Sequence, residues 1–72
     1  MNHRQVDILE WLARADSHNT TVQSYAKKYR VGDQTARNDL NELARLGHAT
    51  AFKIGKARHW RASPNLPKNL GA

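Results

Sequence analysis

The sequence predicts a small α+β domain in which three short helices are followed by a two-stranded β-hairpin. Apolar residues recur at helical spacing in three consecutive segments before residue 47, and each segment begins beside a capping residue. The segment 49–62 instead carries scattered apolar residues on either side of a glycine-containing turn, as a hairpin does. Seventy-two residues suffice for one domain with a modest core, and the absence of cysteine excludes disulfides and thiolate metal sites.

The first helix is expected to begin at Asn2 and to end near Ala15. Asn2 and Gln5 have the spacing of a helix N-cap and the residue three positions later that bonds back to it. The apolar residues that follow at helical spacing are Val6, Ile8, Leu9, Leu12 and Trp11.

A loop and a short second helix come next. Residues 16–19 (DSHN) are all turn formers and predict the loop. Either Thr20 or Thr21 caps the second helix. Its apolar positions are Val22, Tyr25, Ala26 and Tyr29.

The third helix is expected over residues 33–46, with Gly32 or Asp33 as its cap. Gly47 ends it as a residue in the left-handed conformation. Because only a few residues separate this helix from the second one, the pair indicates a helix-turn-helix.

A hairpin is expected over residues 49–62, with its turn at Gly55. Its register is open at this stage. A two-residue loop pairs Phe52 with His59, whereas a three-residue loop pairs Phe52 with Trp60. The complete order is therefore helix, helix, turn, helix, hairpin, which is the plan of a winged helix-turn-helix.

Two regions follow from this plan. Residues 1–62 form the winged helix-turn-helix domain. Residues 63–72 contain two prolines and no apolar period, so they are expected to be a disordered tail or a linker.

The charge of the chain indicates a polyanionic partner. The formal net charge is +6 and the pI is near 10.4. All acidic residues lie between Asp7 and Glu42, so the cations after residue 42 have no neighbouring carboxylate in the sequence. Such a basic balance is typical of nucleic-acid-binding domains, although it also serves solubility. No apolar run approaches the roughly 18 residues of a membrane span, and the N-terminus lacks a signal-peptide core. We therefore expect a cytoplasmic protein without a membrane partner.

The third helix has one buried stripe and one wide polar face. Successive helical residues are turned by about 100°, which groups Ala36, Leu40 and Leu43 on the buried side. The residues on the opposite side are Gln34, Asn38, Asn41 and Arg45. Asparagine is a poor helix former, whereas Asn and Gln meet adenine and Arg meets guanine in the major groove. We interpret this row as candidate base contacts; the alternative is a face that is merely solvated.

Further polar and cationic residues would contact the DNA backbone. Thr35 and Arg37 flank the polar face and are placed to reach phosphates. The other candidates are Lys27 and Lys28 at the end of the second helix and Lys53, Lys56 and Arg58 on the hairpin. Asp33 and Glu42 oppose this pattern, unless Glu42 accepts a hydrogen bond from a cytosine amino group.

The segment SYAKKYRVGDQTARNDLNELARLG resembles the DeoR-type winged helix-turn-helix. Ala26 occupies the small-residue position of the second helix, residues 35–40 carry the Thr-x-Arg-x-Asp-Leu run, and residues 43–47 carry the Leu-x-x-Leu-Gly ending. The chain is particularly similar to the winged-helix domain at the C-terminus of many Fic-family (filamentation induced by cAMP) proteins, including its IGKAR hairpin. The resemblance covers about residues 6 to 62.

The Fic-family resemblance implies a domain of a longer protein, attached to a Fic-like catalytic domain. The catalytic Fic motif is absent from this chain, so AMP transfer is not expected here. This chain departs from the family pattern at two places. It has Gly32 where the family usually has a Ser or Thr cap, and it has His48 and Ala49 where the family usually has Leu or Ile after the glycine that ends the third helix. These departures predict a looser helix start and wing root.

Other kinds of chemistry find little support in the sequence. Only His48 and His59 among the histidines could meet, and two ligands do not make a zinc site. No Ser-His-Asp arrangement can be assembled, so we expect neither an enzyme, a metal site nor a cofactor. The predicted partner is double-stranded DNA. The alternative is a protein-interaction module, with an apolar patch near Trp11, that docks a Fic-like domain or a homodimer partner. RNA binding ranks third.

Overall fold

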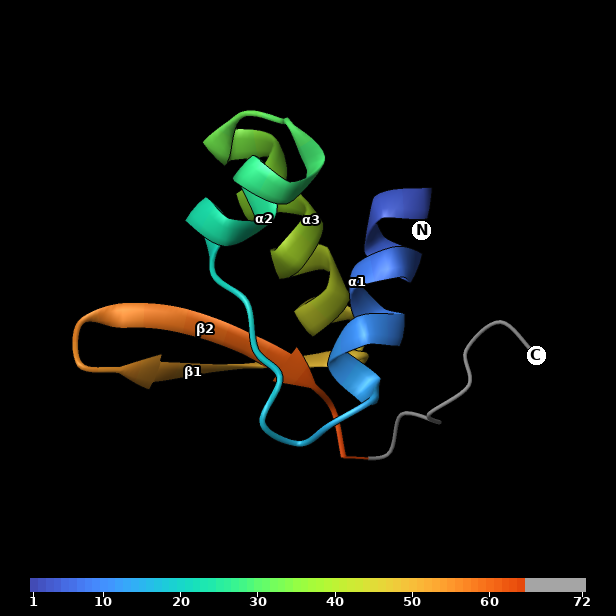
Figure 1. Cartoon of the computed structure of the whole chain (residues 1–72), viewed down its shortest axis with the longest axis vertical. Helices are drawn as coiled ribbons and strands as arrows, with labels where there is room; N and C mark the ends of the chain where they lie inside the picture. The colour runs from blue at the N-terminus through green and yellow to red at the C-terminus, as the bar shows by residue number, and fades with distance from the viewer. Residues whose placement is uncertain (65–72) are drawn as a thin grey trace.

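The computed structural model describes residues 1–64. Within them the chain forms three helices followed by a two-stranded antiparallel hairpin, as expected for a winged helix-turn-helix (Figure 1). The elements are α1 (His3–Ala13), α2 (Val22–Tyr29), α3 (Asp33–Arg45), β1 (Ala49–Ile54) and β2 (Ala57–Ala62). The expected tail lies outside the described residues apart from positions 63 and 64. No helix in residues 1–64 is long and apolar enough to cross a bilayer.

Helix α1 begins as expected and ends two residues early. Asn2 and Gln5 form a reciprocal capping box, which satisfies donors at the helix start. At the other end, the carbonyl of Trp11 accepts from the Arg14 amide and lies 2.7 Å from Nδ1 of His18. In a longer helix this carbonyl would accept from the amide of Ala15. His18 from the loop takes the place of that partner, and the predicted last turn does not form.

The turn between α2 and α3 is tight. Thr21, not Thr20, caps α2, and its hydroxyl accepts from the Ser24 amide. Arg30 ends this helix in the left-handed conformation, with φ +55°. Gly32 is the N-cap of α3 and makes no side-chain cap bond; the looser start of this helix stays a prediction.

Helix α3 ends in a Schellman motif, one residue before the predicted limit. Leu46 is the C-cap, and Gly47 follows with φ +80°. The amide of Gly47 donates to the Ala44 carbonyl and the amide of His48 to the Leu43 carbonyl. This left-handed position favours glycine because a side chain there is strained.

The core lies where the helices meet the base of the hairpin. Ala36, Leu40 and Leu43 are fully buried, which confirms the predicted stripe of α3. The largest buried side chains include Trp60 and Tyr25, and the aliphatic residues packed with them are Ile8, Leu9 and Leu12.

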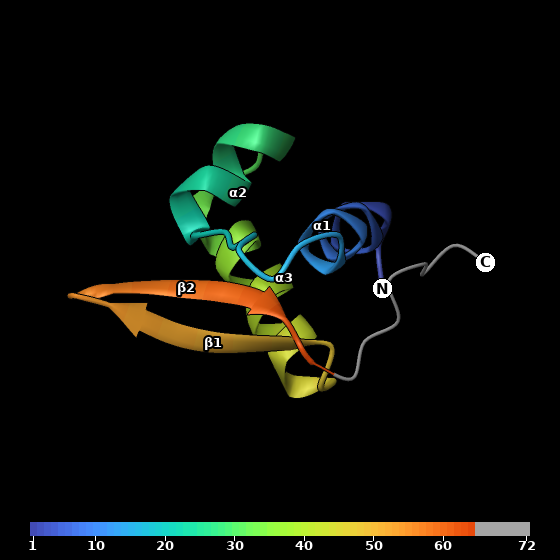
Figure 2. The same ribbon diagram turned by 60° about the horizontal axis from the view of Figure 1, so that its bottom comes forward.

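The hairpin, which we call the wing, has the register of a two-residue loop. Phe52 pairs with His59, and Lys53 pairs with Arg58. Because side chains alternate along a strand, Lys53 and Arg58 share one face with the buried Trp60. This face is the inner face of the wing, because it continues from the core. The wing projects well beyond the helices (Figure 2).

The loop before α2 holds the base of the wing. Thr20 forms an isolated antiparallel bridge with Trp60, with N–H···O distances of 2.8 and 2.9 Å in both directions. Beside it, Oδ1 of Asn19 lies 2.8 Å from Nδ1 of His59. These contacts therefore fix the orientation of the wing relative to the segment that leads into α2.

Candidate nucleic-acid interface

Helix α3 is held in place by a buried carboxylate. Asp39 is only 7% exposed and accepts hydrogen bonds from Nδ2 of Asn2, Nε of Arg4 and the hydroxyl of Tyr25, at 3.1, 2.9 and 2.7 Å. Nε2 of Gln5 also donates to the carbonyl of Asp39, at 3.0 Å. These bonds connect α3 to the start of α1 and to α2, so they fix which face of α3 points outward.

The pKa values of this cluster follow from its bonds. Burial alone would raise the pKa of Asp39, but the hydrogen bonds from Arg4, Tyr25 and Asn2 outweigh it and hold the pKa below its ordinary value. Burial and the bond to Asp39 raise the pKa of Tyr25. Asp39 is therefore ionised and Tyr25 neutral at physiological pH.

The outward face of α3 carries the amide row that the sequence predicts. Gln34, Asn38, Asn41 and Arg45 are all exposed. Nε2 of Gln34 donates to Oδ1 of Asn38 at 2.9 Å. Asn38, Asn41 and Arg45 line one shallow depression together with the two acidic residues of this helix segment, Asp39 and Glu42.

Glu42 is engaged within the domain. One of its carboxylate oxygens accepts from Nε2 of Gln5 at 2.8 Å, and the other lies 3.5 Å from a guanidinium nitrogen of Arg45. The sequence left open whether this carboxylate meets a cytosine. The structure gives it two partners from its own chain.

The inner face of the wing brings two cations together. Lys53 and Arg58 lie directly opposite each other on β1 and β2, and both are exposed. The backbone amide and carbonyl of Trp60 both bond to Thr20, so the pair that Trp60 forms with Ala51 of β1 is of the non-hydrogen-bonded type. Because the two pair types alternate along a hairpin, the Lys53–Arg58 pair is of this type too. Side chains of such pairs are the closer ones, and like charges there destabilise a hairpin.

A groove separates α3 from the wing. Its volume is about 510 Å³, and its lining residues are Thr21, Val22, Gln23, Asp33, Arg37, Asn41, Ala57, Arg58 and Trp60. Arg37 and Arg58 therefore reach the same groove from α3 and from β2. The start of α2, with the positive end of its dipole, forms another wall. Trp60 is 2% exposed, and its Nε1 lacks a hydrogen-bond partner in residues 1–64.

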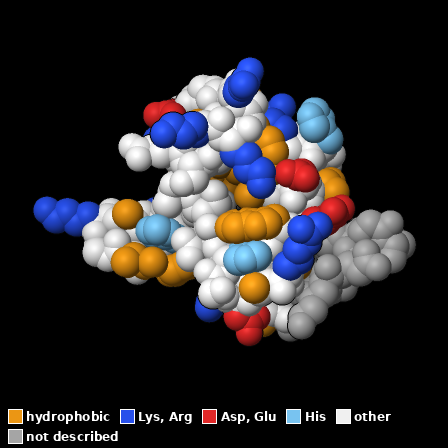
Figure 3. All heavy atoms as spheres, in the orientation of Figure 1, with side chains coloured by type: hydrophobic (Ala, Val, Ile, Leu, Met, Phe, Trp, Pro, Cys, Tyr) orange, Lys and Arg blue, Asp and Glu red, His pale blue; other side chains and the backbone are white. Residues whose placement is uncertain are grey.

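Not all the predicted cations gather at this groove. Lys56 lies in the wing turn, at the far end of the wing, where Figure 3 shows a cationic side chain projecting from the molecule. Lys27 and Thr35 are exposed but do not line the groove. Lys28 is turned toward α1, with its ammonium 3.9 Å from Asp7.

The surface around Trp11 is partly covered. The ring of His18 stacks on the indole with centroids 4.1 Å apart and planes 6° apart, and Nζ of Lys28 lies 5.5 Å from the ring centroid. Trp11 itself is half-buried. The apolar patch predicted there is thus capped by a histidine and a lysine.

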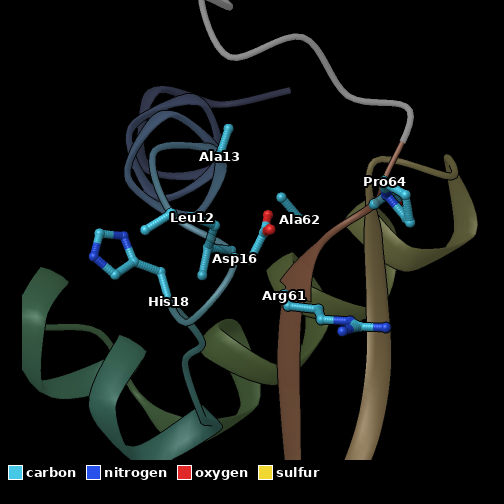
Figure 4. A pocket seen from close by; sticks show the side chains of 9 residues that line it. Leu12, Ala13, Asp16, His18, Arg61, Ala62 and Pro64 are labelled. Atoms are coloured by element: carbon cyan, nitrogen blue, oxygen red, sulfur yellow. The ribbon is translucent and has the colours of Figure 1, made fainter.

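A second hollow, of about 310 Å³, lies between the end of α1 and the end of β2. Figure 4 shows Asp16 directed toward Ala62 in this hollow, while Arg61 extends across β1. The Arg61 guanidinium lies 5.6 Å from the ring centroid of Phe52, on the outer face of the wing. Within residues 1–64, no three potential metal ligands among His, Asp and Glu lie together.

Sequence reasoning missed the supports of this interface. It named Asp39 only as part of a motif, although the helical rotation places that residue beside Leu43 rather than on the polar face. That position could have indicated a buried carboxylate. Two further features depend on tertiary packing, and no local sequence pattern predicts them. One is the start of α2 lining the groove, and the other is the covering of Trp11 by a histidine and a lysine.

Comparison with known proteins agrees with this geometry. Residues 4–52 match the family model of the DeoR-like helix-turn-helix domain. The match begins in α1, includes α2 and α3, and ends within β1. No curated protein and no solved structure matches the chain significantly. Since the matched segment covers more than half of the chain and contains the complete helix-turn-helix, the chain belongs to the DeoR-like helix-turn-helix domain family.

Proposed function

We propose that this chain is a DNA-binding module of the transcription-regulator type that prefers particular sequences in duplex DNA. Helix α3 lies in the major groove, and the wing follows the sugar–phosphate backbone or enters the minor groove. The base-reading row is Gln34, Asn38, Asn41 and Arg45, whose members contact bases directly or orient a neighbour that does. The backbone contacts come from Thr35, Arg37, Lys27, Lys28, Lys53, Lys56 and Arg58. Membership of a helix-turn-helix family supports a DNA partner.

The observation that carries this proposal is the Lys53–Arg58 pair on the inner face of the wing. Two like charges directly opposite each other destabilise a hairpin. A phosphate lying between them would turn the repulsion into attraction. Arg58 of this pair and Asn41 of the amide row line the same groove, so one duplex can meet both elements.

The groove beside α3 fits the path of a DNA strand. Arg37 and Arg58 approach it from opposite walls, and the first turn of α2 adds backbone amides. With α3 in the major groove, the strand that borders that groove passes between the helix and the wing. We assign this groove to one or two backbone phosphates, which position the domain without reading sequence.

A duplex titration tests the proposal. The chain should bind labelled duplex with a dissociation constant in about the micromolar range, and the affinity should fall roughly a thousand-fold between 50 and 200 mM salt because bound counterions are released. Amide-shift mapping during the same titration should perturb α3 and the wing together. An affinity insensitive to salt, or shifts confined to α1, would contradict the proposal.

Two substitutions separate the roles of helix and wing. Asn38→Ala should lower the preference for an enriched sequence over random duplex, because it removes a base contact. Lys56→Ala should weaken binding to all duplexes alike and make the salt dependence less steep, because it removes a phosphate contact. Affinities of both variants for both duplexes, measured side by side, check this. Equal losses on the two duplexes for both variants would defeat the division.

A protein-docking role within a Fic-like protein or a homodimer remains the alternative prediction. The Fic-like assignment depends on the similarity of the IGKAR wing segment, which is residues 54–58. Sedimentation of the free chain and a binding assay with an isolated Fic-type catalytic domain would test it. We expect the DNA-binding role to be exercised in the cytoplasm.

A further inference from the structure

Two exposed amides on α3 are joined before any ligand arrives. Nε2 of Gln34 donates to Oδ1 of Asn38 at 2.9 Å, across one helical turn. Both side chains are exposed, so the bond does not serve to satisfy buried polar groups. A surface bond of this kind contributes little to helix stability. Its more specific effect is on the orientation of Asn38.

The bond decides which end of the Asn38 amide points toward the N-terminus of α3. An amide oxygen has two lone pairs, so Oδ1 keeps one acceptor position while it accepts from Gln34. Within residues 1–64, Nδ2 of Asn38 donates no hydrogen bond, so both of its hydrogens can bond to a ligand. Asn38 therefore presents a donor and an acceptor side by side, with their order fixed.

That pair of groups is complementary to the major-groove edge of adenine. Adenine offers N7 as an acceptor and its N6 amino group as a donor, and a single amide can meet both. A freely rotating amide has to be ordered on binding, whereas an amide already held by a neighbour does not.

We propose that Asn38 reads the adenine of one A·T base pair and that Gln34 is the positioning residue that orients it. The inference deepens the proposed DNA-binding function and rests on it. Nδ2 of Asn38 donates to adenine N7, and Oδ1 accepts from the N6 amino group while it still accepts from Gln34.

The other side chains of the polar face are engaged differently. Arg45 lies 3.5 Å from the carboxylate of Glu42, and Asn41 lies against the groove beside the wing. Asn38 is next to Asp39, whose buried bonds fix the backbone at this point of α3. The amide of Asn38 thus starts from a rigid position, which bidentate recognition requires.

The inference is tested by selecting, from a pool of random duplexes, those that the full chain binds. Each base pair of the selected site is then replaced in turn and the affinity is measured. The wild-type chain should discriminate against replacement of one A·T pair by roughly ten-fold. Asn38→Ala should reduce this ratio to about one at that position only. Replacing the adenine by 7-deazaadenine, which lacks N7, or by purine, which lacks the amino group, should weaken wild-type binding but not binding by Asn38→Ala.

Variants of Gln34 separate positioning from a general structural effect. Gln34→Met has a similar shape and cannot donate, so discrimination at the same position should fall roughly three-fold. Gln34→Lys restores a donor and should restore the ratio, although its charge strengthens binding to every duplex. In the Asn38→Ala background, Gln34→Met should have no further effect on the ratio, since the two residues act as one unit.

The possible failures are distinguishable. Full discrimination by Gln34→Met, or loss at a different base pair from that of Asn38→Ala, would overturn the positioning role. Salt-dependent duplex binding with no adenine preference at any position would overturn the inference and leave the proposed function intact. Absence of duplex binding by the wild-type chain would overturn the proposed function itself.

Discussion

Asp39 shows how one side chain connects the interior of the domain to its outer face. Its carboxylate accepts from three donors on α1, its cap and α2. Its neighbours in the sequence are Asn38, which is exposed, and Leu40, which is fully buried. The polar bonds at residue 39 therefore fix the rotation of α3 about its own axis. Apolar packing alone, being non-directional, specifies that rotation less closely.

Substitution of Asp39 by Asn should destabilise the domain in a pH-dependent way. The pKa of this carboxyl is below its ordinary value in the folded chain, so its contribution is present above the unfolded-state pKa of about 3.9 and lost as the pH falls through the folded-state pKa. At neutral pH we expect Asp39→Asn to lower the free energy of unfolding by about 2 kcal/mol.

Denaturant unfolding of both chains from neutral pH down to strongly acidic pH measures this difference. The gap between wild type and Asp39→Asn should narrow below about pH 4, because the unfolded wild-type chain then binds a proton at residue 39 before the folded chain does. At still lower pH the folded carboxyl is protonated too and loses its charge-assisted bonds. A constant gap over the whole range would mean that the ionised carboxylate is not the stabilising species.

At the scale of elements, the wing combines a structural cost with a proposed binding role. Two cations lie opposite each other on its inner face. On its outer face, the ring of Phe52 has the His59 ring and the Arg61 guanidinium as neighbours, each 5.6 Å from its centroid. Ile54, at the end of β1, is 55% exposed. The two faces of one hairpin thus differ in chemistry, and only the inner one is turned toward α3.

Replacement of Lys53 by Thr should stabilise the fold and weaken DNA binding. It removes the like-charge pair and introduces a residue with high strand propensity, so the free energy of unfolding should rise by about 0.5 kcal/mol. Affinity for all duplexes should fall because a phosphate contact is lost. Thermal unfolding and duplex titration measure the two effects.

The matched control is Arg61→Thr, which removes the same charge from the outer face of the wing. Its effect on duplex affinity should be clearly smaller than that of Lys53→Thr. Similar losses for both variants would indicate that net charge, rather than the inner face, determines binding.

The elements and the faces of α3 could be predicted from the sequence, because helical rotation and capping are local. The register of the wing could not, since a loop of two or three residues fits the turn at Gly55 equally well. The structure decides for two residues, which places Lys53 opposite Arg58. The direction of the Lys28 side chain could not be predicted either, because it is set by Asp7 and Trp11 across the helix interface. The base and phosphate contacts themselves stay predictions.

At the scale of the whole molecule, helix α3 and the wing are connected through a third segment. The backbone of Trp60 both donates to and accepts from the backbone of Thr20, which immediately precedes Thr21, the N-cap of α2. Helix α2 in turn packs on α3 and is tied to it by Tyr25. The two proposed DNA-contacting elements therefore keep a fixed separation, so the free chain is already arranged for binding.

Hydrogen exchange should reveal this connection. The amides of Trp60 and Arg58 both point away from β1, but within residues 1–64 only the Trp60 amide has a hydrogen-bond partner, the Thr20 carbonyl at 2.8 Å. The Trp60 amide should therefore exchange at least roughly ten-fold more slowly than that of Arg58, after correction for intrinsic rates. Equal rates for the two amides would mean that the bridge opens freely and that the wing swings independently of the helices.

The single bridge at Thr20 also determines where the domain can accept a change of length. Upstream of it, Asp16 and Ser17 are exposed, so extra residues there would extend outward and leave every later element in place. Downstream, only Thr21 stands between the bridge and α2. An insertion at that point would shift the second helix against the wing and change the spacing between the elements proposed to contact DNA.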